Sequence, residues 1–273
     1  MVRRRSGRSR RSKDAFPWFT AVVSGVVLLL VIGGFSYVYM NALSQNRALG
    51  ADLCPELGPA AQTIVLVDAT DAIAPLTQTE ISTRLQDIGQ SISRGEKLEL
   101  RTLQPGDERT HTIFARCNPG DGSDLDHLTA NPESARQRWR ESFSAPLHDA
   151  MQTVMGDAAA ETSPIMAALQ QIAVENLTSE HNRSIRTHII IISDMLENSP
   201  HYSIYRSGPD FDAYMASAAP ARFNSDLAGA MVEIWYLRRN TRIASVPLME
   251  FWFEWIATNR GQPGRALSLQ GLE

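Results

Sequence analysis

The stretch TIVLVDATDA, residues 63–72, decides the expected fold, because it ends an apolar run in two carboxylates and a threonine hydroxyl. Residues 64–67 are apolar at every position and not at every second one. Such a run is typical of a strand covered on both faces, as in the parallel sheets of α/β domains. Because ligands bind at the carboxyl ends of strands in these sheets, Asp68, Thr70 and Asp71 mark a candidate site.

Further apolar runs predict the other strands of this sheet. THIIIISD, residues 187–194, delivers Asp194 at its end, and AMVEIWYL covers residues 230–237. Two short strands are predicted between the first strand and residues 187–194, namely KLELRTL (97–103) and THTIFAR (110–116). Their connection is too short for a parallel crossover, which needs about a dozen residues, so they are expected to form an antiparallel hairpin.

Helical segments alternate with these strands. The predicted helices are 76–93, 133–156, 163–176 and 247–261. Thr77 is expected to cap the first helix. Thr162 or Ser163 is expected to cap the third, with Pro164 near its first position. Pro146 is expected to bend or break the second.

This order of elements predicts an α/β fold with a mostly parallel central sheet, one antiparallel edge hairpin and helices on both faces. The predicted domain spans 62–262, with Gly261 as the C′ residue of its last helix, and 263–273 are expected to form a C-terminal tail. Aromatic residues gather in the last predicted strand and helix and are expected to pack in the core, with Phe253 pointing elsewhere. They are Trp235, Tyr236, Phe251, Trp252, Phe253 and Trp255.

The first 40 residues predict a membrane anchor behind a basic tail. Residues 1–14 hold seven Lys and Arg and one Asp, whereas residues 15–40 hold no charged side chain. Because about 20 apolar residues in a helix cross the hydrocarbon core, residues 15–40 predict a single transmembrane helix. The positive-inside rule places the tail in the cytoplasm and the chain after Met40 outside it, in the periplasm for a Gram-negative source. A cleaved signal peptide is the alternative, and the length of the apolar run disfavours it.

The composition bounds the number of domains and the class of partner. The chain has 273 residues, 43% of them hydrophobic, which suffices for one folded domain beside the anchor. Its 26 basic and 30 acidic residues give a net charge of −4; without residues 1–14, 19 basic and 29 acidic residues remain, a net charge of about −10. An acidic domain argues against nucleic-acid binding.

The segment 41–61 is small and polar and predicts a stalk before the domain. It contains Cys54, and Cys117 follows the predicted hairpin; these are the two cysteines of the chain. Both lie beyond the predicted membrane span, where an oxidising compartment lets a disulfide persist. Cys54 precedes the first strand and Cys117 follows a strand that runs back to the same sheet edge, so a Cys54–Cys117 disulfide is predicted.

The strand ends carry a resemblance to a known family. Residues 62–262 resemble a von Willebrand factor type A domain, whose first strand ends in D-x-S-x-S and whose fourth strand ends in Asp. Asp68 matches the leading Asp of that motif and Thr70 its first Ser, and Asp194 matches the later Asp. Ala72 stands where the second Ser belongs, so the motif is incomplete.

The resemblance implies a divalent cation site. Members of the family hold a cation, usually Mg²⁺, whose coordination a carboxylate of a protein partner completes. Here Asp68, Thr70, Asp194 and either Thr162 or Ser163 would supply the oxygen ligands, which suit a hard ion such as Mg²⁺. Since Ala72 has no side-chain oxygen, a retained metal site and a degenerate, purely structural site both stay open.

The strand end also resembles that of haloacid-dehalogenase-like phosphohydrolases, with Asp68 as nucleophile and Asp194 on Mg²⁺. Those enzymes normally carry a second acid at position 70 and need a Lys to neutralise the phosphoryl charge. Lys97, the single Lys after residue 13, is predicted to lie in the hairpin. Because the sequence has no HExxH pair, CxxC pair or glycine-rich phosphate loop, we assign no catalytic residue.

The sequence therefore predicts a single-pass protein of the cell envelope that presents a von Willebrand A-like domain outside the cytoplasm. The domain is expected to bind a protein partner, with Mg²⁺ as the one candidate cofactor. A membrane-anchored phosphohydrolase and a structural subunit of a membrane complex with a degenerate metal site are the alternatives.

Overall fold

A computed structural model of the chain describes residues 18–45, 50–104, 109–125, 131–154 and 162–269. The chain divides into two compact units, Met1–Ala48 and Leu49–Glu273. We call the second the sheet unit and describe each unit by itself.

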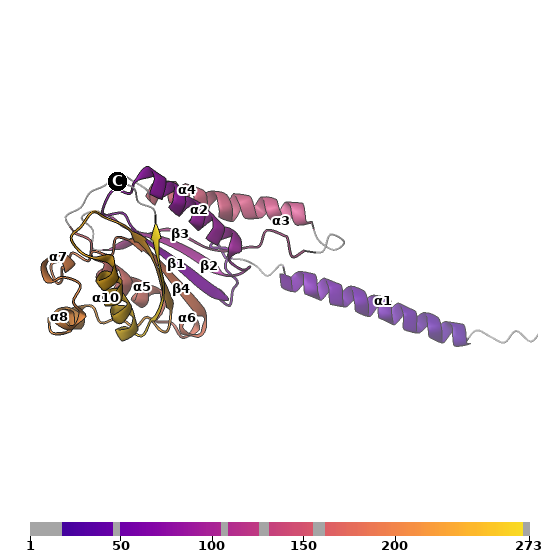
Figure 1. Ribbon diagram of the computed structural model, residues 1–273. Helices are drawn as coiled ribbons and strands as arrows, with labels where there is room; N and C mark the ends of the chain where they lie inside the picture. The colour runs from indigo at the N-terminus through magenta and orange to yellow at the C-terminus, as the bar shows by residue number, and fades with distance from the viewer. Residues whose placement is uncertain (1–17, 46–49, 105–108, 126–130, 155–161, 270–273) are drawn as a thin grey trace, which may run out of the picture. The chain divides into compact units, whose positions relative to one another are not determined.

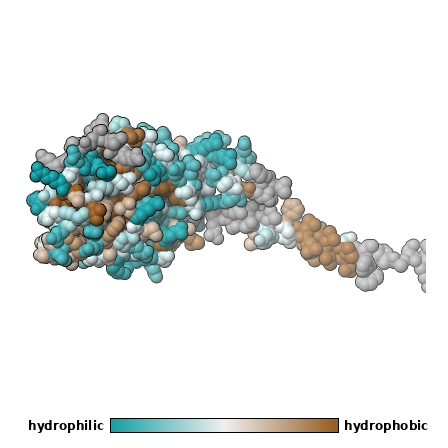
Figure 2. All heavy atoms as spheres, viewed as in Figure 1, coloured by the Kyte–Doolittle hydropathy of each residue, from teal (hydrophilic) through white to brown (hydrophobic). Residues whose placement is uncertain are grey.

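In the described part of the first unit, helix α1 (Trp18–Gln45) runs for 28 residues. Its valines and leucines between residues 22 and 31 are exposed, and Figure 2 shows the helix covered by hydrophobic side chains. Across the described residues of the chain, no helix is long and apolar enough to cross a membrane. The transmembrane helix predicted at 15–40 is therefore not confirmed and stays a prediction. The basic tail at 1–14 lies outside the described residues.

Six strands form one sheet in the sheet unit. They are β1 (Ala61–Asp68), β2 (Lys97–Leu103), β3 (Thr110–Cys117), β4 (Arg186–Ser193), β5 (Met231–Leu237) and β6 (Gln262–Leu269). Their order is β3-β2-β1-β4-β5-β6, and every neighbouring pair is parallel except β2 and β3. The mostly parallel sheet with one antiparallel edge hairpin is thus confirmed. All eight residues of β1 are buried, as expected for a strand covered on both faces.

Strand β6 corrects the prediction of a C-terminal tail at 263–273. It pairs in parallel with β5, from Met231 opposite Gln262 to Leu237 opposite Leu269. Most of its side chains are exposed or half-buried, so its sequence lacks the apolar pattern of the inner strands. Residues 270–273 lie outside the described part of the chain.

Helices cover both faces of this sheet. In chain order they are α2 (Pro75–Ser91), α3 (Pro132–Trp139), the π-helical segment η1 (Arg140–Ser144), α4 (Ala145–Val154), α5 (Ile165–Asn176), α6 (Glu180–Ser184), α7 (Ile204–Ser207), α8 (Phe211–Met215), α9 (Ala219–Arg222) and α10 (Ser245–Thr258). Figure 1 shows α2 and α4 on one face and α5 and α10 on the other. Each face carries its own apolar core, and each fully buried large side chain in it contributes roughly 1.5–3 kcal/mol.

The two predicted helix caps are wrong. Helix α2 begins at Pro75, after Ala74, which makes no side-chain cap hydrogen bond, and Thr77 lies inside the helix on its buried face. Proline presets φ for the first helical position and so starts α2 earlier than expected. In α5 the cap position is Pro164, again without a side-chain cap, because the hydroxyl of Ser163 donates to Asp68 instead.

The predicted helix is not broken at Pro146, because the chain stays helical from Pro132 to Val154; only its hydrogen-bonding pattern changes before the proline. The helical stretch changes from α3 through the π-helical turn η1 to α4, and Pro146 lies in the first turn of α4. A proline has no N–H to donate, so the hydrogen-bonding pattern changes immediately before it. Phe143 of η1 is fully buried against the α2 side of the sheet.

The core role predicted for the aromatic cluster is confirmed. Phe251, Trp252 and Trp255 of α10 are at most 1% exposed, and Phe253 is only half-buried. The end of α10 differs from the expectation, because Arg260 and not Gly261 has positive φ, 62°. Arg260 N donates to Ala257 O and Gly261 N donates to Ile256 O. This is the Schellman pattern with Arg260 at C′ and Gly261 at C″, one position after the predicted one.

The predicted disulfide is confirmed. Cys54 and Cys117 are bonded with their Cα atoms 4.8 Å apart. Cys117 ends β3, the edge strand next to β2, and its N–H donates to Asp52 O at 2.9 Å. The segment before β1 therefore passes the first residue of β2, Lys97, to reach the outer strand β3. The antiparallel direction of the hairpin predicted this arrangement.

Candidate functional site

Asp68 is the centre of a cluster at the carboxyl edge of the sheet. It ends β1 and is 6% exposed. Its Oδ1 accepts hydrogen bonds from the backbone N of Thr70 at 3.1 Å and from its hydroxyl at 2.6 Å. Its Oδ2 accepts from the hydroxyls of Ser163 at 2.9 Å and Ser193 at 2.7 Å. The four acceptor positions of the carboxylate are therefore filled by groups of the protein.

Three separate segments bring these donors together. Thr70 follows β1 directly, Ser193 ends the neighbouring parallel strand β4, and Ser163 precedes α5. Ser163 is fixed by a two-way backbone hydrogen bond with Asn198. Of the two residues left open for the middle hydroxyl, Ser163 reaches Asp68, whereas Thr162 is half-buried and has no hydrogen bond to Asp68 among the described contacts.

Asp194 lies beside Asp68 and pairs with an arginine. It follows β4, is 5% exposed, and accepts a hydrogen bond from Leu196 N at 3.0 Å. Its Oδ2 lies 3.4 Å from Nε of Arg239, which comes from the loop after β5. Burial, with the negative charge of Asp68 nearby, raises the pKa of Asp194 to about 6, although Arg239 opposes this shift.

Arg239 also contacts the loop after β1. Its Nη1 donates to the backbone oxygen of Ala72 at 2.8 Å. Ala72, the position that lacks a hydroxyl, is exposed, and Asp71 is half-buried close enough to raise the pKa of Asp194. We call Asp68, Thr70, Ser163, Ser193, Asp194 and Arg239 the strand-end site.

The turn after Asp194 has an unusual backbone. Met195 is fully buried with φ of 61°, a left-handed conformation that few residues other than glycine adopt. Its N–H is bound by the hydroxyl of Ser193 at 2.8 Å, and its carbonyl oxygen accepts from Nε1 of Trp252 at 2.7 Å. These two contacts hold Asp194 in place at the edge of the sheet.

Glu197 is a buried carboxyl that the sequence did not single out. It is fully buried, and its Oε2 accepts from the N–H of Met166 in the first turn of α5 at 2.8 Å. Its Oε1 has no hydrogen-bond partner among the described residues. Desolvation raises the pKa of Glu197 to about 8 against the hydrogen bond from Met166. It caps α5 in place of the predicted hydroxyl.

The sequence prediction found Asp68, Thr70, Ser163 and Asp194 and missed the other two members of the site. Ser193 stands directly before Asp194 at a strand end, which was an available signal. Arg239 belongs to the run RRNTR, residues 238–242, directly after a strand whose carboxyl end lies at the same edge. The loop position was predictable from the strand order, but its contacts were not.

The strand-end site fits a divalent cation poorly. The hydroxyls of Thr70 and Ser163 keep lone pairs that a hard ion could use. However, the guanidinium of Arg239 already pairs with Asp194 and lies against Ala72, where a ligand oxygen is missing. In the described residues no group of three His, Cys, Asp or Glu is placed to hold a metal ion.

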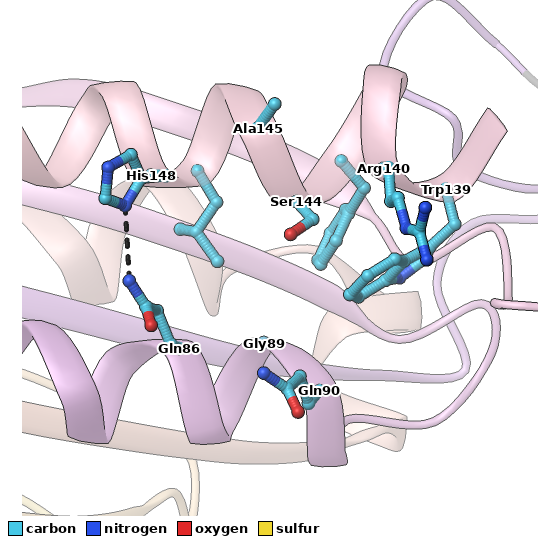
Figure 3. A pocket seen from close by; sticks show the side chains of 10 residues that line it. Gln86, Gly89, Gln90, Trp139, Arg140, Ser144, Ala145 and His148 are labelled. Carbon is cyan, nitrogen blue, oxygen red and sulfur yellow. Dashed lines mark hydrogen bonds between the residues drawn. The ribbon is translucent and has the colours of Figure 1, made fainter. Parts of the chain in front are cut away.

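A separate pocket of about 400 Å³ lies between α2 and the α3–η1–α4 segment. Figure 3 shows Gln86 of α2 hydrogen-bonded to His148 of α4, with Trp139 and Arg140 at the other end. The Gln86 Nε2 to His148 Nδ1 distance is 3.2 Å. No residue of the strand-end site lines this pocket, so the two features are distinct.

Comparison with known proteins gives distant structural likenesses. No protein-family model matches the sequence, and no curated protein matches it. An aerotolerance-related membrane protein from Bacteroides fragilis NCTC 9343, with multiple mutations to serines, is similar over 77% of this chain and 92% of its own, at 14% identity and a TM-score of 0.38. Three N-terminal domains of the type V pili tip protein Mfa5 from Porphyromonas gingivalis are similar over 68% of this chain and 29% of theirs, at 14% identity and a TM-score of 0.32. Likenesses this distant carry no argument about what this chain binds.

Proposed function

We propose that this chain is an envelope protein whose N-terminal apolar segment anchors it in a membrane and whose sheet unit binds another protein. The observation that carries the proposal is the strand-end site. Parallel α/β sheets bind ligands at their carboxyl edge, and here that edge gathers Asp68, Asp194 and Arg239 from three different strand ends. The von Willebrand A-like character of the unit belongs to this proposal, as does a partner outside the cytoplasm.

The site supports binding better than phosphoryl transfer. A nucleophilic carboxylate needs a free lone pair, whereas Asp68 accepts four hydrogen bonds. Lys97, the residue that a phosphohydrolase would need nearby, begins β2 and bonds Glu99 at 2.6 Å. In the β1–β2 register Lys97 pairs with Gln62, and Asp68 pairs with Leu103 six residues further on. Lys97 is therefore at the opposite edge of the sheet.

Membrane anchoring rests on the sequence. Residues 15–40 carry no charge and follow seven basic residues, the pattern of a single span with a cytoplasmic N-terminus. Fractionation of cells that produce the full chain tests this part. The chain should stay with the membranes after alkaline washing and be released by detergent; release by alkali alone would contradict the anchor.

The binding surface is testable by site-specific photo-crosslinking in cells. Tyr205 is 55% exposed. Burial raises the pKa of its hydroxyl most, and the negative charges of Asp194 and Asp71 add to the shift. Tyr205 therefore lies near the strand-end site. Leu57 is 77% exposed and precedes β1, at the opposite edge. A photoreactive residue at position 205 should capture one defined protein, and the same residue at position 57 should not. Capture from position 57 alone would refute this surface.

A further inference from the structure

We propose that Arg239 is the resident cation of the strand-end site, so that the site keeps its shape without a metal ion. This inference deepens the proposed function, because it concerns the same edge of the sheet. Of the two states open at Ala72, a retained metal site and a degenerate one, the site is then the degenerate one, with a guanidinium in place of the ion.

Arg239 bridges two strand ends. It lies in the loop that follows β5, next to β4 in the sheet. Its Nε is 3.4 Å from Oδ2 of Asp194, after β4, and its Nη1 is 2.8 Å from the carbonyl oxygen of Ala72, after β1. One guanidinium thus joins the loops of three strands. A planar group with several fixed donors suits such bridging better than a point charge does.

Both buried carboxylates of the site have partners from the protein without a further ion. Asp68 and Asp194 are both at least 94% buried, and a buried carboxylate needs hydrogen-bond donors or an opposite charge. Asp68 has donors at all four acceptor positions. Asp194 has Leu196 N on Oδ1 and Arg239 facing Oδ2. A divalent cation added beside this guanidinium would be repelled by it.

The arginine also accounts for the alanine at position 72. A side-chain oxygen there is dispensable when no ion needs it, and the backbone oxygen of Ala72 serves as an acceptor for Arg239 instead. The missing ligand and the added cation therefore occur at the same point of the site. This coincidence is the reason to treat Arg239 as a replacement for the ion and not as an unrelated surface residue.

The experiment uses the full chain in detergent micelles. Isothermal titration with MgCl₂ and then MnCl₂ should give no saturable heat, and neither salt should raise Tm. Arg239→Ala should lower Tm by about 2–4 °C, the shift that a domain of this size shows for loss of a modest interaction. Arg238→Ala, at the exposed neighbouring position, is the matched control and should leave Tm unchanged.

Two results would overturn the inference. One is saturable Mg²⁺ or Mn²⁺ binding by the wild-type chain that Asp194→Ala abolishes. The other is an equal Tm for Arg239→Ala and Arg238→Ala. Failure of the proposed function is distinguishable from both, because loss of crosslinking at position 205 leaves the metal titration unaffected.

Discussion

At the scale of single residues, Glu197 is a fully buried carboxyl whose ionised form is disfavoured by desolvation. Its carboxylate accepts a hydrogen bond from Met166 N in the first turn of α5, where the helix dipole favours negative charge. Desolvation nevertheless dominates and raises its pKa to about 8 from an ordinary value of 4.5. Because the folded chain holds this proton more tightly than the unfolded chain, folding takes up a proton between these two values.

This linkage predicts a pH effect on stability. The contribution of Glu197 is fully present below its unfolded pKa and is lost as the pH rises toward 8, with a slope approaching about 1.4 kcal/mol per pH unit. Glu197→Gln keeps an acceptor for Met166 and removes the titration, so its free energy of unfolding should gain on the wild type from pH 5 to pH 8. Urea unfolding at several pH values measures this. Glu254→Gln, on the exposed side of α10, is the control, and parallel pH profiles for wild type and Glu197→Gln would contradict the prediction.

At the scale of elements, the end of α10 shows how a helix can be stopped by an unfavourable residue. Arg260 adopts φ of 62° at the position where glycine is most common. Gly261, the next residue, lies in a crowded position. A Cβ atom there would lie 2.8 Å from both Ile256 Cγ2 and Leu227 Cδ1.

Arg260→Gly should therefore stabilise the sheet unit. Relief of the left-handed conformation should raise the free energy of unfolding by about 0.5–1 kcal/mol, after the greater entropy of glycine in the unfolded chain is counted. Arg260→Ala is the matched control, because it removes the same exposed ion pair with Asp226 and retains the unfavourable φ. Chemical denaturation compares the two variants. If Arg260→Gly is no more stable than Arg260→Ala, the left-handed φ of Arg260 costs no stability.

At the scale of the whole molecule, the Cys54–Cys117 bridge closes a loop of 63 residues that contains β1, α2 and the hairpin. It ties the segment before β1 to the edge strand β3. The chain-entropy account gives such a loop about 4 kcal/mol of stability, since it restricts the unfolded chain.

Removal of the bridge should lower stability by that order. The double variant Cys54→Ser/Cys117→Ser should unfold with about 4 kcal/mol less free energy than the oxidised wild type. Wild-type protein treated with a reductant is the control and should match the double variant. An oxidised wild type no more stable than its reduced form would show that the bridge contributes nothing.

The sequence by itself determined the part of this protein that depends on local pattern. Continuous apolar runs located β1, β4 and β5, and the short linker after 97–103 fixed the direction of the hairpin. That direction placed Cys54 and Cys117 at one edge. Two strand-end aspartates then located the site, because parallel strands end together.

Only the tertiary structure decided what depends on contacts between distant segments. Strand β6 is exposed on most of its length, so backbone pairing with β5 creates it and no apolar pattern announces it. Arg239 and Ser193 joined the site because loops and strand ends meet there, and hydrogen bonds of this kind depend on a few ångströms of geometry. Glu197 shows the same limit: burial set its pKa, and burial of a polar side chain is a property of the packed fold and not of the residue.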